Sequence, residues 1–382
     1  MRDVVILGST GSIGVQALEI IEANPGQFRV VALTAAGNNI ELLVAQAVKF
    51  KVSVVGVTHN ADQVRLGLPG VQVIDGPDAS TEVAAITCDV VLNAITGSIG
   101  LAPTLAALRV GNRLALANKE SLVAGGDMVM ALAKPGQLLP VDSEHSALWQ
   151  ALKSGTKSEV SKLILTASGG PFRDRDDLST VTIAEALAHP TWAMGPVVTI
   201  NSSTLVNKGL EIIEAHYLFD IPYAQIEAVI HPQSVVHSMV EFVDGSTIAQ
   251  ASPPNMKGPI SFALSHPHRV AHATKPIDWS TSHTWSFTPI DESRFPAVAL
   301  ARTCGEIGGG LPAIFNASNE VAVQAFIDGQ ISFTDIFKIV SQSVDHLRAT
   351  AAKTLRDLED VSAAEDDARQ ISSELVKKGA HR

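Results

Sequence analysis

The chain has 382 residues, of which 46% are hydrophobic, and this length and composition are sufficient for two or three domains with a sizeable core. Its formal net charge of −11 argues against nucleic acid or an anionic membrane surface as a partner. Cys88 and Cys304 are too few for a disulfide framework and no apolar stretch approaches the roughly 20 residues that span a bilayer, so we expect a cytoplasmic protein.

Apolar strands alternate with amphipathic segments from residue 2 to about 142. The strand-like stretches include "DVVILG", "FRVVALTA", "VSVVGVT", "CDVVLNAI" and "RLALANK". Alternation of this kind, with nearly unbroken apolar strands, predicts βαβ units on a parallel sheet that is covered on both faces. We therefore predict an α/β, Rossmann-like domain over residues 1–142.

The first of these strands runs into the glycine-rich turn "LGSTGSIG" and then into a helical pattern. In this position backbone amides can hold a pyrophosphate at the positive end of the helix, although an ordinary strand-to-helix turn is the alternative. The spacing G-x-x-G-x-x-G, completed by Gly14, is a variation on the dinucleotide fingerprint. The turn residues predicted to bind the cofactor are Gly8, Thr10, Gly11, Ser12 and Ile13.

The end of the second strand, "LTAAGNN", indicates which dinucleotide is bound. It carries no Asp or Glu for the ribose hydroxyls of NAD, which favours NADP. It carries no Arg or Lys either, so the extra phosphate would be met by Gly37, Asn38 and Asn39 through backbone and amide contacts. Polar groups also follow later strands, and Asn118 and Glu120 are candidates for the nicotinamide end.

The stretch "VDSEHSALWQ" places Asp142 and Glu144 two positions apart after an apolar run. In an extended backbone the two carboxylates would be neighbours on one side of the strand, where charges ~4 Å apart repel by roughly 4 kcal/mol at an effective dielectric near 20. Solvent, a helix N-terminus or a cation would offset this repulsion. The helix N-terminus is a real alternative to the cation, because acidic residues and serines favour a first helical turn.

The pattern changes from about residue 143. Strand-like stretches follow as "KLILTAS", "PVVTINSS", "IEAVIHP", "VVHSMVEFV" and "STIAQAS", and Asp244-Gly245 between the last two is a hairpin signal. We predict an α+β domain with antiparallel pairing over 143–270, a connection over 271–295 that lacks periodicity, and a helical domain over 296–382.

The stretch "NSSTLVNKGLEIIEAHYLF" predicts an amphipathic helix capped by Ser202 or Ser203. The face opposite its apolar stripe collects Asn207, Lys208, Glu211 and Glu214. Taken alone, this is a solvated face with a Lys–Glu contact. Beside the paired carboxylates it would add a third anionic oxygen ligand, and such a set is what Mg²⁺ or Mn²⁺ prefers.

Eight motifs together carry a resemblance to a known family. In order they are "LGSTGSIG", "LANKESLVAGG", "VDSEHSA", "TASGGPF", "HPTWAMG", "NSSTLVNKGLE", "HPQSVVHSMV" and "ASPPNMKGPI". Across nearly the whole chain they resemble the 1-deoxy-D-xylulose 5-phosphate reductoisomerase family. The resemblance implies an NADPH-dependent, divalent-metal enzyme and homodimer that converts this sugar phosphate to 2-C-methyl-D-erythritol 4-phosphate in non-mevalonate isoprenoid biosynthesis.

The resemblance also implies roles for individual residues. It makes Asp142, Glu144 and Glu211 the metal ligands, and it adds Lys208 and His189 to the catalytic set, with His189 at the start of a mobile flap. Gly195 joins the cofactor-binding residues. The substrate-binding residues that it implies are Ser143, Lys119, Ser168, His189, Trp192, Ser202, Asn207 and Lys208.

The alternatives are a semialdehyde-type dehydrogenase and a non-catalytic NADP-sensing protein, and the sequence argues against a short-chain dehydrogenase. A semialdehyde-type dehydrogenase shares a glycine turn of this kind but needs a reactive thiol, and neither Cys88 nor Cys304 has the required setting. A short-chain dehydrogenase needs Tyr-x-x-x-Lys, which follows neither Tyr217 nor Tyr223. A non-catalytic NADP-sensing protein would bind dinucleotide without any dependence on divalent metal.

Overall fold

The protein is described by a computed structural model that covers residues 1–192 and 194–379. The chain divides into two compact units, and each unit is assembled from separate stretches of sequence. The first contains Met1–Ser121, Val129–Ser146 and Asn255–Lys275, and the second contains Leu122–Met128, Ala147–Pro254 and Pro276–Arg382.

The first unit is built on a parallel seven-stranded sheet with strand order β4-β3-β2-β1-β5-β6-β7. Its strands are β1 (Arg2–Leu7), β2 (Phe28–Ala35), β3 (Val54–Val57), β4 (Gln72–Asp75), β5 (Val90–Asn93), β6 (Arg113–Leu116) and β7 (Leu138–Pro140). The predicted parallel sheet is confirmed. The strand order reverses beside β1, which places a topological switch point at the carboxyl end of that strand, where open sheets of this type bind their ligands.

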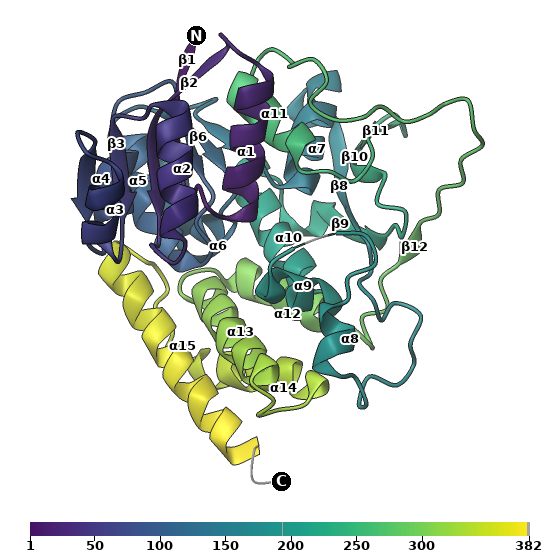
Figure 1. The fold of residues 1–382 in the computed structure, drawn as a ribbon. Helices are drawn as coiled ribbons and strands as arrows, with labels where there is room; N and C mark the ends of the chain where they lie inside the picture. Colours follow the sequence, from purple (N-terminus) through teal and green to yellow (C-terminus); the bar gives the residue numbers. More distant parts are fainter. Residues whose placement is uncertain (193, 380–382) are drawn as a thin grey trace. The chain divides into compact units, whose positions relative to one another are not determined.

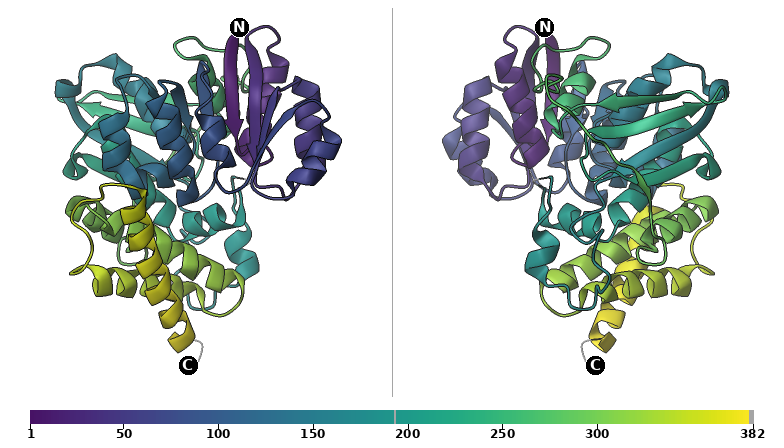
Figure 2. Two further views of the ribbon diagram at one scale, coloured as in Figure 1. Left: turned by 90° about the vertical axis from the view of Figure 1, so that its left-hand side faces the viewer. Right: turned by 90° about the vertical axis from the view of Figure 1, so that its right-hand side faces the viewer.

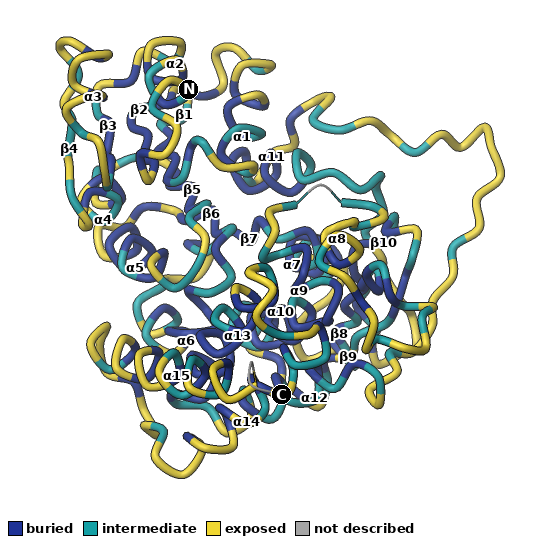
Figure 3. The backbone as a smooth tube through the Cα atoms, turned by 60° about the horizontal axis from the view of Figure 1, so that its bottom comes forward, coloured by how far each residue is buried: buried dark blue, intermediate teal, exposed yellow. Residues whose placement is uncertain are grey.

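Helices cover this sheet because its strands are apolar on both faces. All four residues of β5 are buried, and the inner strands run as dark blue tube in Figure 3. In Figure 1, α1 and α2 lie on the near face of the sheet. The helices of the unit are α1 (Ser12–Ala23), α2 (Ile40–Phe50), α3 (Ala61–Gly67), α4 (Ala79–Ala84), α5 (Leu101–Arg109), the two ends of α6 (Glu120–Leu132) and α11 (Lys257–Ser265).

Because of helix α11, the boundaries of the two compact units differ from the domain boundaries predicted at residues 142 and 270. It packs against α1, and the Nζ of Lys257 lies 2.8 Å from the Oε2 of Glu19. The chain therefore returns to the first unit after the second sheet has been formed. A prediction that reads the chain in order cannot detect a return of this kind, because the contact joins segments about 240 residues apart.

The second unit contains a mixed five-stranded sheet of order β11-β10-β8-β9-β12, whose strands are coloured teal and green in the right-hand view of Figure 2. Its strands are β8 (Val160–Ala167), β9 (Ile226–Ile230), β10 (Val236–Phe242), β11 (Thr247–Ala251) and β12 (Thr288–Pro289). β8 and β9 are parallel and the other pairs are antiparallel. The predicted hairpin at Asp244-Gly245 joins β10 to β11, with the amide of Phe242 donating to the Ser246 carbonyl at 2.8 Å.

Two predictions for the segment around residue 200 are wrong. The stretch "PVVTINSS", predicted as a strand, is helix α9 (Pro196–Ser203). The helix predicted to start at Asn201 instead begins later as α10 (Val206–Phe219), because Leu205 adopts a left-handed backbone with φ of 58°. Pro196 favours the start of a helix at its first position, and burial of α9 overrides the β preference of its Val and Thr residues.

Four helices at the end of the chain complete the second unit: α12 (Ala297–Ile307), α13 (Leu311–Ile327), α14 (Phe333–Leu347) and α15 (Leu358–Gly379). α13 packs against α14 and α15, which is yellow in Figures 1 and 2. The predicted helical character of this region is confirmed for the described residues. Its core is continuous with that of the sheet, because the Phe172 ring stacks edge-on with Phe333 at 5.1 Å.

The remaining elements are short. The other α-helices are α7 (Ser143–Ala151) and α8 (Ile183–Leu187), and the 3-10 helices are Ser98–Gly100, Leu152–Ser154, Lys157–Glu159 and Tyr223–Gln225. Between α11 and β12 the chain forms no helix or strand and is largely exposed (Figure 3). None of the described helices has the length and apolar character needed to cross a bilayer.

Candidate active site

The glycine turn lies between β1 and α1 and is packed too closely to accept side chains. Gly8 has φ of 77°, and a Cβ on Gly14 would lie 2.4 Å from the Gly8 carbonyl oxygen. Helix α1 begins after Gly11 without a side-chain cap and without an acidic residue in its first turn. Its first amides therefore remain available to an anion, which suits the pyrophosphate of a dinucleotide.

Gly14→Ala is expected to loosen this turn. The added methyl group would meet the backbone of Gly8 and Ser9 below 3 Å, so α1 must move away from β1, at a cost of about 1–3 kcal/mol. Thermal unfolding should show a lower Tm and a titration should show weaker NADPH binding. Gly11→Ala is the matched control, because the nearest atom to its Cβ is at 3.4 Å. A Gly14→Ala protein as stable as Gly11→Ala would contradict the tight packing.

The turn after β2, predicted to meet the adenosine phosphate, is held by its neighbours. Gly37 has φ of 100°, and a Cβ there would lie 2.2 Å from the His59 carbonyl oxygen. The side-chain amide of Asn60 donates to the Gly37 carbonyl at 3.1 Å. The Asn39 side-chain oxygen accepts from the Leu42 amide at 3.0 Å and so caps α2. The side-chain oxygen of Asn39 thus caps α2. Contacts of Gly37, Asn38 and Asn39 with the phosphate of the cofactor stay a prediction.

Asn118 has a structural role that its position in the sequence did not suggest. It is 2% exposed, and its amide group donates to the carbonyls of Ile95 at 2.7 Å and Gly97 at 2.8 Å and to Glu120 at 3.0 Å. Its oxygen accepts from the Ser121 amide at 2.9 Å. These bonds fasten the loop after β5 to the start of α6. Asn118 therefore shapes the edge of the sheet at which the predicted nicotinamide end would lie.

Asp142 directly precedes α7 and Glu144 lies in its first turn, so of the two arrangements considered the helix N-terminus is present and the extended backbone is not. The Ser146 amide donates to the Asp142 carbonyl at 2.8 Å, which closes the first helical turn, and Ser143 donates to the Glu144 carboxylate. The Nζ of Lys119 lies 2.7 Å from the Asp142 carboxylate. A helix N-terminus and a lysine thus both offset the negative charge of this pair.

The charged face of α10 is buried, which contradicts the solvated face that the residues alone favour. Lys208 is 3% exposed and Glu211 is 1% exposed, and the two form an ion pair. The Lys208 ammonium also donates to the Thr166 carbonyl at the end of β8, and the Asn207 amide donates to Glu211. The opposite face is covered as well, because a Cβ on Gly209 would lie 2.6 Å from the Ala301 Cβ.

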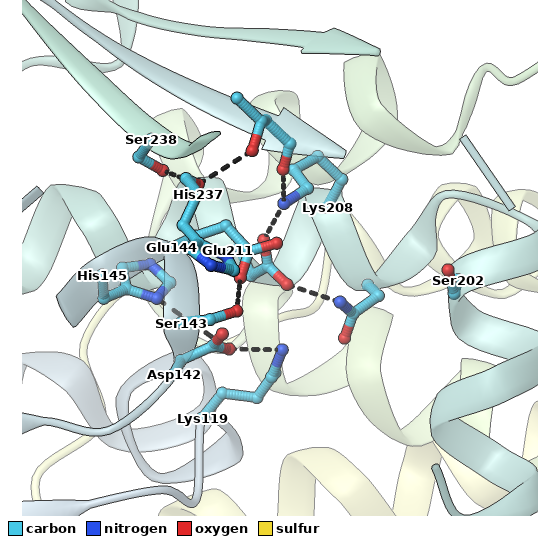
Figure 4. A network of polar contacts seen from close by, with 12 residues as sticks. Lys119, Asp142, Ser143, Glu144, His145, Ser202, Lys208, Glu211, His237 and Ser238 are labelled. Atoms are coloured by element: carbon cyan, nitrogen blue, oxygen red, sulfur yellow. Dashed lines mark hydrogen bonds and ion pairs between the residues drawn. The ribbon is translucent and has the colours of Figure 1, made fainter. Parts of the chain in front are cut away.

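Two groups of side chains have the composition of a cation site. In the first, one carboxylate oxygen from each of Asp142, Glu144 and Glu211 lies within 4.8 Å of the others. In the second, ligand atoms of Asp142, His145 and Glu214 meet the same limit. Figure 4 shows Lys119 beside Asp142 and Lys208 beside Glu211. The all-carboxylate group fits Mg²⁺, a hard ion that prefers oxygen ligands, and metal binding by these residues stays a prediction.

A second polar cluster gathers Ser168, His189 and Ser202. The His189 Nε2 lies 3.0 Å from the Ser168 Oγ and 3.1 Å from the Ser202 Oγ. The Nδ1 accepts hydrogen bonds from the amides of Thr191 at 3.1 Å and Trp192 at 2.9 Å. Burial and the nearby Arg173 guanidinium lower the pKa of His189, so its imidazole is neutral at neutral pH.

The local backbone explains how this cluster forms. Ser168 follows β8 and precedes Gly169 and Gly170, which both have positive φ and let the chain turn sharply. Ser202 lies in the last turn of α9 rather than at a helix start, and Gly195 is the N-cap residue of the same helix. A cofactor contact by Gly195 stays a prediction. The Trp192 ring lies 6.1 Å from the His237 ring.

Several residues of these clusters were not predicted. Thr166 contributes only its carbonyl, His145 and Glu214 belong to the second cation group, and Arg173 lowers the pKa of His189. Asn319 on α13 donates to the Asn201 side chain at 2.9 Å, next to Ser202. The position of Thr166 at a strand end was visible in the sequence. A contact across about 120 residues, such as that of Asn319, leaves no local signal.

The two thiols do not support a dehydrogenase that works through a cysteine. Burial raises the pKa of both Cys88 and Cys304 to about 12, so both are protonated at neutral pH. A thiolate nucleophile requires the opposite, a pKa lowered by nearby positive charge or a helix N-terminus.

Comparisons with known proteins agree over the whole chain. The model of 1-deoxy-D-xylulose 5-phosphate reductoisomerase matches residues 4–126, that of its C-terminal domain matches 138–219, and that of the DXP reductoisomerase C-terminal domain matches 251–371. The reductoisomerase of Kitasatospora griseola is 57% identical, covering 97% of this chain and 99% of that protein. That of Streptomyces coelicolor is 53% identical, covering 99% of this chain and 94% of that protein.

Solved structures give the same result. The reductoisomerase of Zymomonas mobilis in complex with NADPH superposes with a TM-score of 0.91 at 41% identity, covering 98% of this chain and 99% of that one. A reductoisomerase in complex with NADPH, fosmidomycin and magnesium superposes with a TM-score of 0.93 at 37% identity, covering 99% of this chain and 98% of that one.

Proposed function

This chain belongs to the 1-deoxy-D-xylulose 5-phosphate reductoisomerase family, and from that premise we propose which of its residues carry the reaction. It is an NADPH- and Mg²⁺-dependent enzyme that rearranges and reduces 1-deoxy-D-xylulose 5-phosphate to 2-C-methyl-D-erythritol 4-phosphate. The observation that carries the assignment of roles is the group of three carboxylates at Asp142, Glu144 and Glu211.

We propose that these three carboxylates hold the ion. Each supplies a hard anionic oxygen, and the ion would offset the mutual repulsion of three negative charges. When bound there, Mg²⁺ acts as a Lewis acid on the oxygens of a hydroxy-ketone. The ion pairs of Asp142 with Lys119 and of Glu211 with Lys208 orient both carboxylates. We propose that Mn²⁺ can replace Mg²⁺, because its ligand preference is similar.

We propose that the cluster around His189 receives the phosphate of the substrate. Ser168 and Ser202 offer hydroxyl groups that converge on one imidazole nitrogen. Asn207 and Lys208 follow on α10, and the ammonium of Lys208 supplies positive charge for a dianion. Binding at the phosphate, remote from the reacting carbons, would position the substrate for its chemistry. Trp192 and Ser143 complete the proposed substrate contacts.

We propose that NADPH lies at the glycine turn, with its pyrophosphate at the start of α1. The close approach of Gly14 to Gly8 supports this assignment, because a side chain at Gly14 would push the start of α1 away from the turn after β1. NADPH bound there would supply the hydride that reduces the aldehyde formed by the rearrangement. We further propose that the enzyme is a homodimer, which the family resemblance supports, and that it works in the cytoplasm, which the two free cysteines support.

Removal of divalent metal tests the proposed function. We expect NADPH oxidation in the presence of 1-deoxy-D-xylulose 5-phosphate, followed by absorbance, to fall by more than about 100-fold in chelator, because Lewis-acid stabilisation is worth several kcal/mol. Added Mg²⁺ should restore the rate. NADPH binding, measured by titration in the same chelator, should be unchanged. Oxidation that persists in chelator would contradict the metal site, and dinucleotide binding without any turnover would favour a non-catalytic NADP-sensing protein.

A further inference from the structure

Three neighbouring strands of the seven-stranded sheet end at the same level beside the glycine turn. Leu7 at the end of β1 pairs with Asn93 at the end of β5, and Asn93 pairs with Leu116 at the end of β6. The loop after β5 (residues 94–100, the β5 loop) packs against the glycine turn, because a Cβ on Gly8 would lie 2.8 Å from the first carbonyl oxygen of this loop. The β5 loop therefore borders the proposed cofactor site.

Four buried polar side chains lie beneath the β5 loop. They belong to Asn93 on β5, Thr104 on α5, Asn118 after β6 and Ser121 on α6, and each is at most 2% exposed. The Asn93 Nδ2 lies 2.9 Å from the Thr104 Oγ1, which lies 3.0 Å from the Ser121 Oγ. The Ser121 hydroxyl in turn bonds to the Asn118 side-chain oxygen. The four side chains thus form one continuous chain of hydrogen bonds in the interior of the first unit.

Backbone groups fix the direction of this chain. The Asn93 Oδ1 accepts from the Ile95 amide at 3.2 Å, so the Asn93 Nδ2 is the donor toward Thr104. The Ser121 backbone amide donates to the Asn118 Oδ1 at 2.9 Å, so the Ser121 hydroxyl also donates to that oxygen. A hydroxyl group has a single hydrogen, and Ser121 therefore accepts the hydrogen bond that it shares with Thr104.

The chain of hydrogen bonds begins and ends at the same residue of the β5 loop. At one end Asn93 accepts from the Ile95 amide, and at the other end the Asn118 Nδ2 donates to the Ile95 carbonyl at 2.7 Å. Thr104 and Ser121 form the middle of the chain and act on the loop through the two asparagines. Because the chain is buried, each of its groups is costly to leave without a partner, and the loop is held firmly.

We propose that Thr104 and Ser121 are positioning residues for NADPH, whose hydroxyl groups hold the β5 loop in the shape that receives the nicotinamide half of the cofactor. The proposal rests on the cofactor site proposed above, with the pyrophosphate at the glycine turn and the extra phosphate at the turn after β2. In the strand order β5 lies on the opposite side of β1 from β2, which is the side left for the nicotinamide half. A preformed loop reduces the conformational entropy that binding would otherwise cost.

Three variants test the proposal. Thr104→Val removes the hydroxyl group but keeps the branched shape, so it interrupts the chain without opening a large cavity. Thr104→Ser keeps the hydroxyl group and should preserve the chain. Asn112→Ala is the matched control, because Asn112 is 2% exposed and lies directly before β6, at the opposite edge of the same sheet. Its side chain bonds to the carbonyls of Ala84 and Ile86 and to the Cys88 amide, so its loss removes buried hydrogen bonds away from the β5 loop.

Binding is measured on the full-length enzyme by titration with two probes. One is NADPH, and the other is the adenosine bisphosphate fragment of NADP, which carries the extra phosphate but no nicotinamide. The fragment can reach the turn after β2 but has no group to contact the β5 loop. Thermal unfolding reports the stability of each variant, and kcat at saturating NADPH reports the chemical steps. A general loosening of the first unit would weaken the binding of both probes.

Thr104→Val should weaken NADPH binding by about tenfold, the effect of one buried hydrogen bond, and should leave binding of the fragment and kcat within about twofold of the parent. Thr104→Ser should bind both probes like the parent. Asn112→Ala should lower the Tm at least as far as Thr104→Val does, without a change in either affinity. Unchanged NADPH binding in Thr104→Val, or equal weakening of both probes, would overturn the proposal.

Gly14→Ala distinguishes failure of this inference from failure of the proposed cofactor site. If Gly14→Ala weakens the binding of both probes while Thr104→Val shows no selective loss of NADPH, the site stands and the role of the β5 loop is wrong. If Gly14→Ala changes neither affinity, the proposed site is wrong and the role of Thr104 and Ser121 falls with it. Weaker binding of both probes in Gly14→Ala, together with the selective loss in Thr104→Val, supports both.

Discussion

Glu211→Gln is expected to lower the rate of NADPH oxidation by at least about 1,000-fold while NADPH binding is retained. Gln is isosteric with Glu but has one neutral oxygen in place of a carboxylate, so the ion would lose one of three anionic ligands. A loss of about 4 kcal/mol of transition-state stabilisation corresponds to this factor. The cofactor turn lies on β1 and α1 and contains none of the changed atoms, so NADPH affinity should be unchanged.

Glu214→Gln is the matched control for this substitution. Both glutamates are 1% exposed, both are on α10, and each belongs to one of the two groups that have the composition of a cation site. If Asp142, Glu144 and Glu211 hold Mg²⁺, Glu214→Gln should keep the rate within about tenfold, as for a residue that acts only from outside the ligand set. Equal losses, or a larger loss in Glu214→Gln, would instead point to the group that contains His145.

The measurement is a titration of the initial rate with Mg²⁺ for the parent and both variants. Loss of a ligand should shift the concentration of Mg²⁺ at half-maximal rate upward as well as lower the plateau. A variant that fails to bind NADPH or that has a much lower Tm has a folding defect. Its lower rate in the Mg²⁺ titration would then reflect misfolding and not the loss of a metal ligand. Comparison of two buried, isosteric changes on one helix limits this risk.

The part of the fold that could be predicted follows from patterns that are local in the chain. The alternation of apolar strands and helices up to residue 142 predicts a parallel sheet. It can be recognised because the periodicity of hydrophobic residues and the composition of each strand are properties of short stretches of sequence. The turn at Gly8 was identified for the same reason. β4, which has no buried residue, and β7, which has only three residues, carry too little apolar signal to be recognised alone.

The segment around α9 shows where local patterns mislead. Val197, Val198 and Ile200 have the composition of a strand, yet Pro196–Ser203 is helical. The deciding factors are Pro196 at the first turn and the burial of Thr199 and Ile200 among other helices, which packing determines and propensity does not. The consequence matters for the site, because the helix places Ser202 beside His189.

The charged face of α10 was ambiguous for a different reason. Periodicity separates an apolar face from a polar one, and a polar face is normally solvated. Here Lys208, Glu211 and Glu214 are all buried, so the helix is covered on both sides. Buried charges of both signs at one place are costly unless they are paired or bind a ligand, and they are therefore a sign of function that only the folded chain reveals.

Lys208→Met is expected to destabilise the metal-free protein by about 3–5 kcal/mol, the usual cost of removing one partner of a buried ion pair. The Met side chain has about the length of the lysine stem, so the cavity term is small. What is lost is the ammonium group that contacts Glu211 and the Thr166 carbonyl. Activity should also fall steeply, because the proposed phosphate contact is removed.

Mg²⁺ and a second substitution test whether the destabilisation arises from the charge of Glu211. Because Mg²⁺ binds the folded state, it should raise the Tm of Lys208→Met more than that of the parent, since the ion replaces the missing positive charge. The double variant Lys208→Met with Glu211→Gln should be more stable than Lys208→Met alone, because no charge is then left unbalanced at this pair. Chemical unfolding with and without Mg²⁺ measures both effects. Strictly additive losses would mean that the two side chains are not coupled, and Lys208 would then stabilise the protein through Thr166 and through packing.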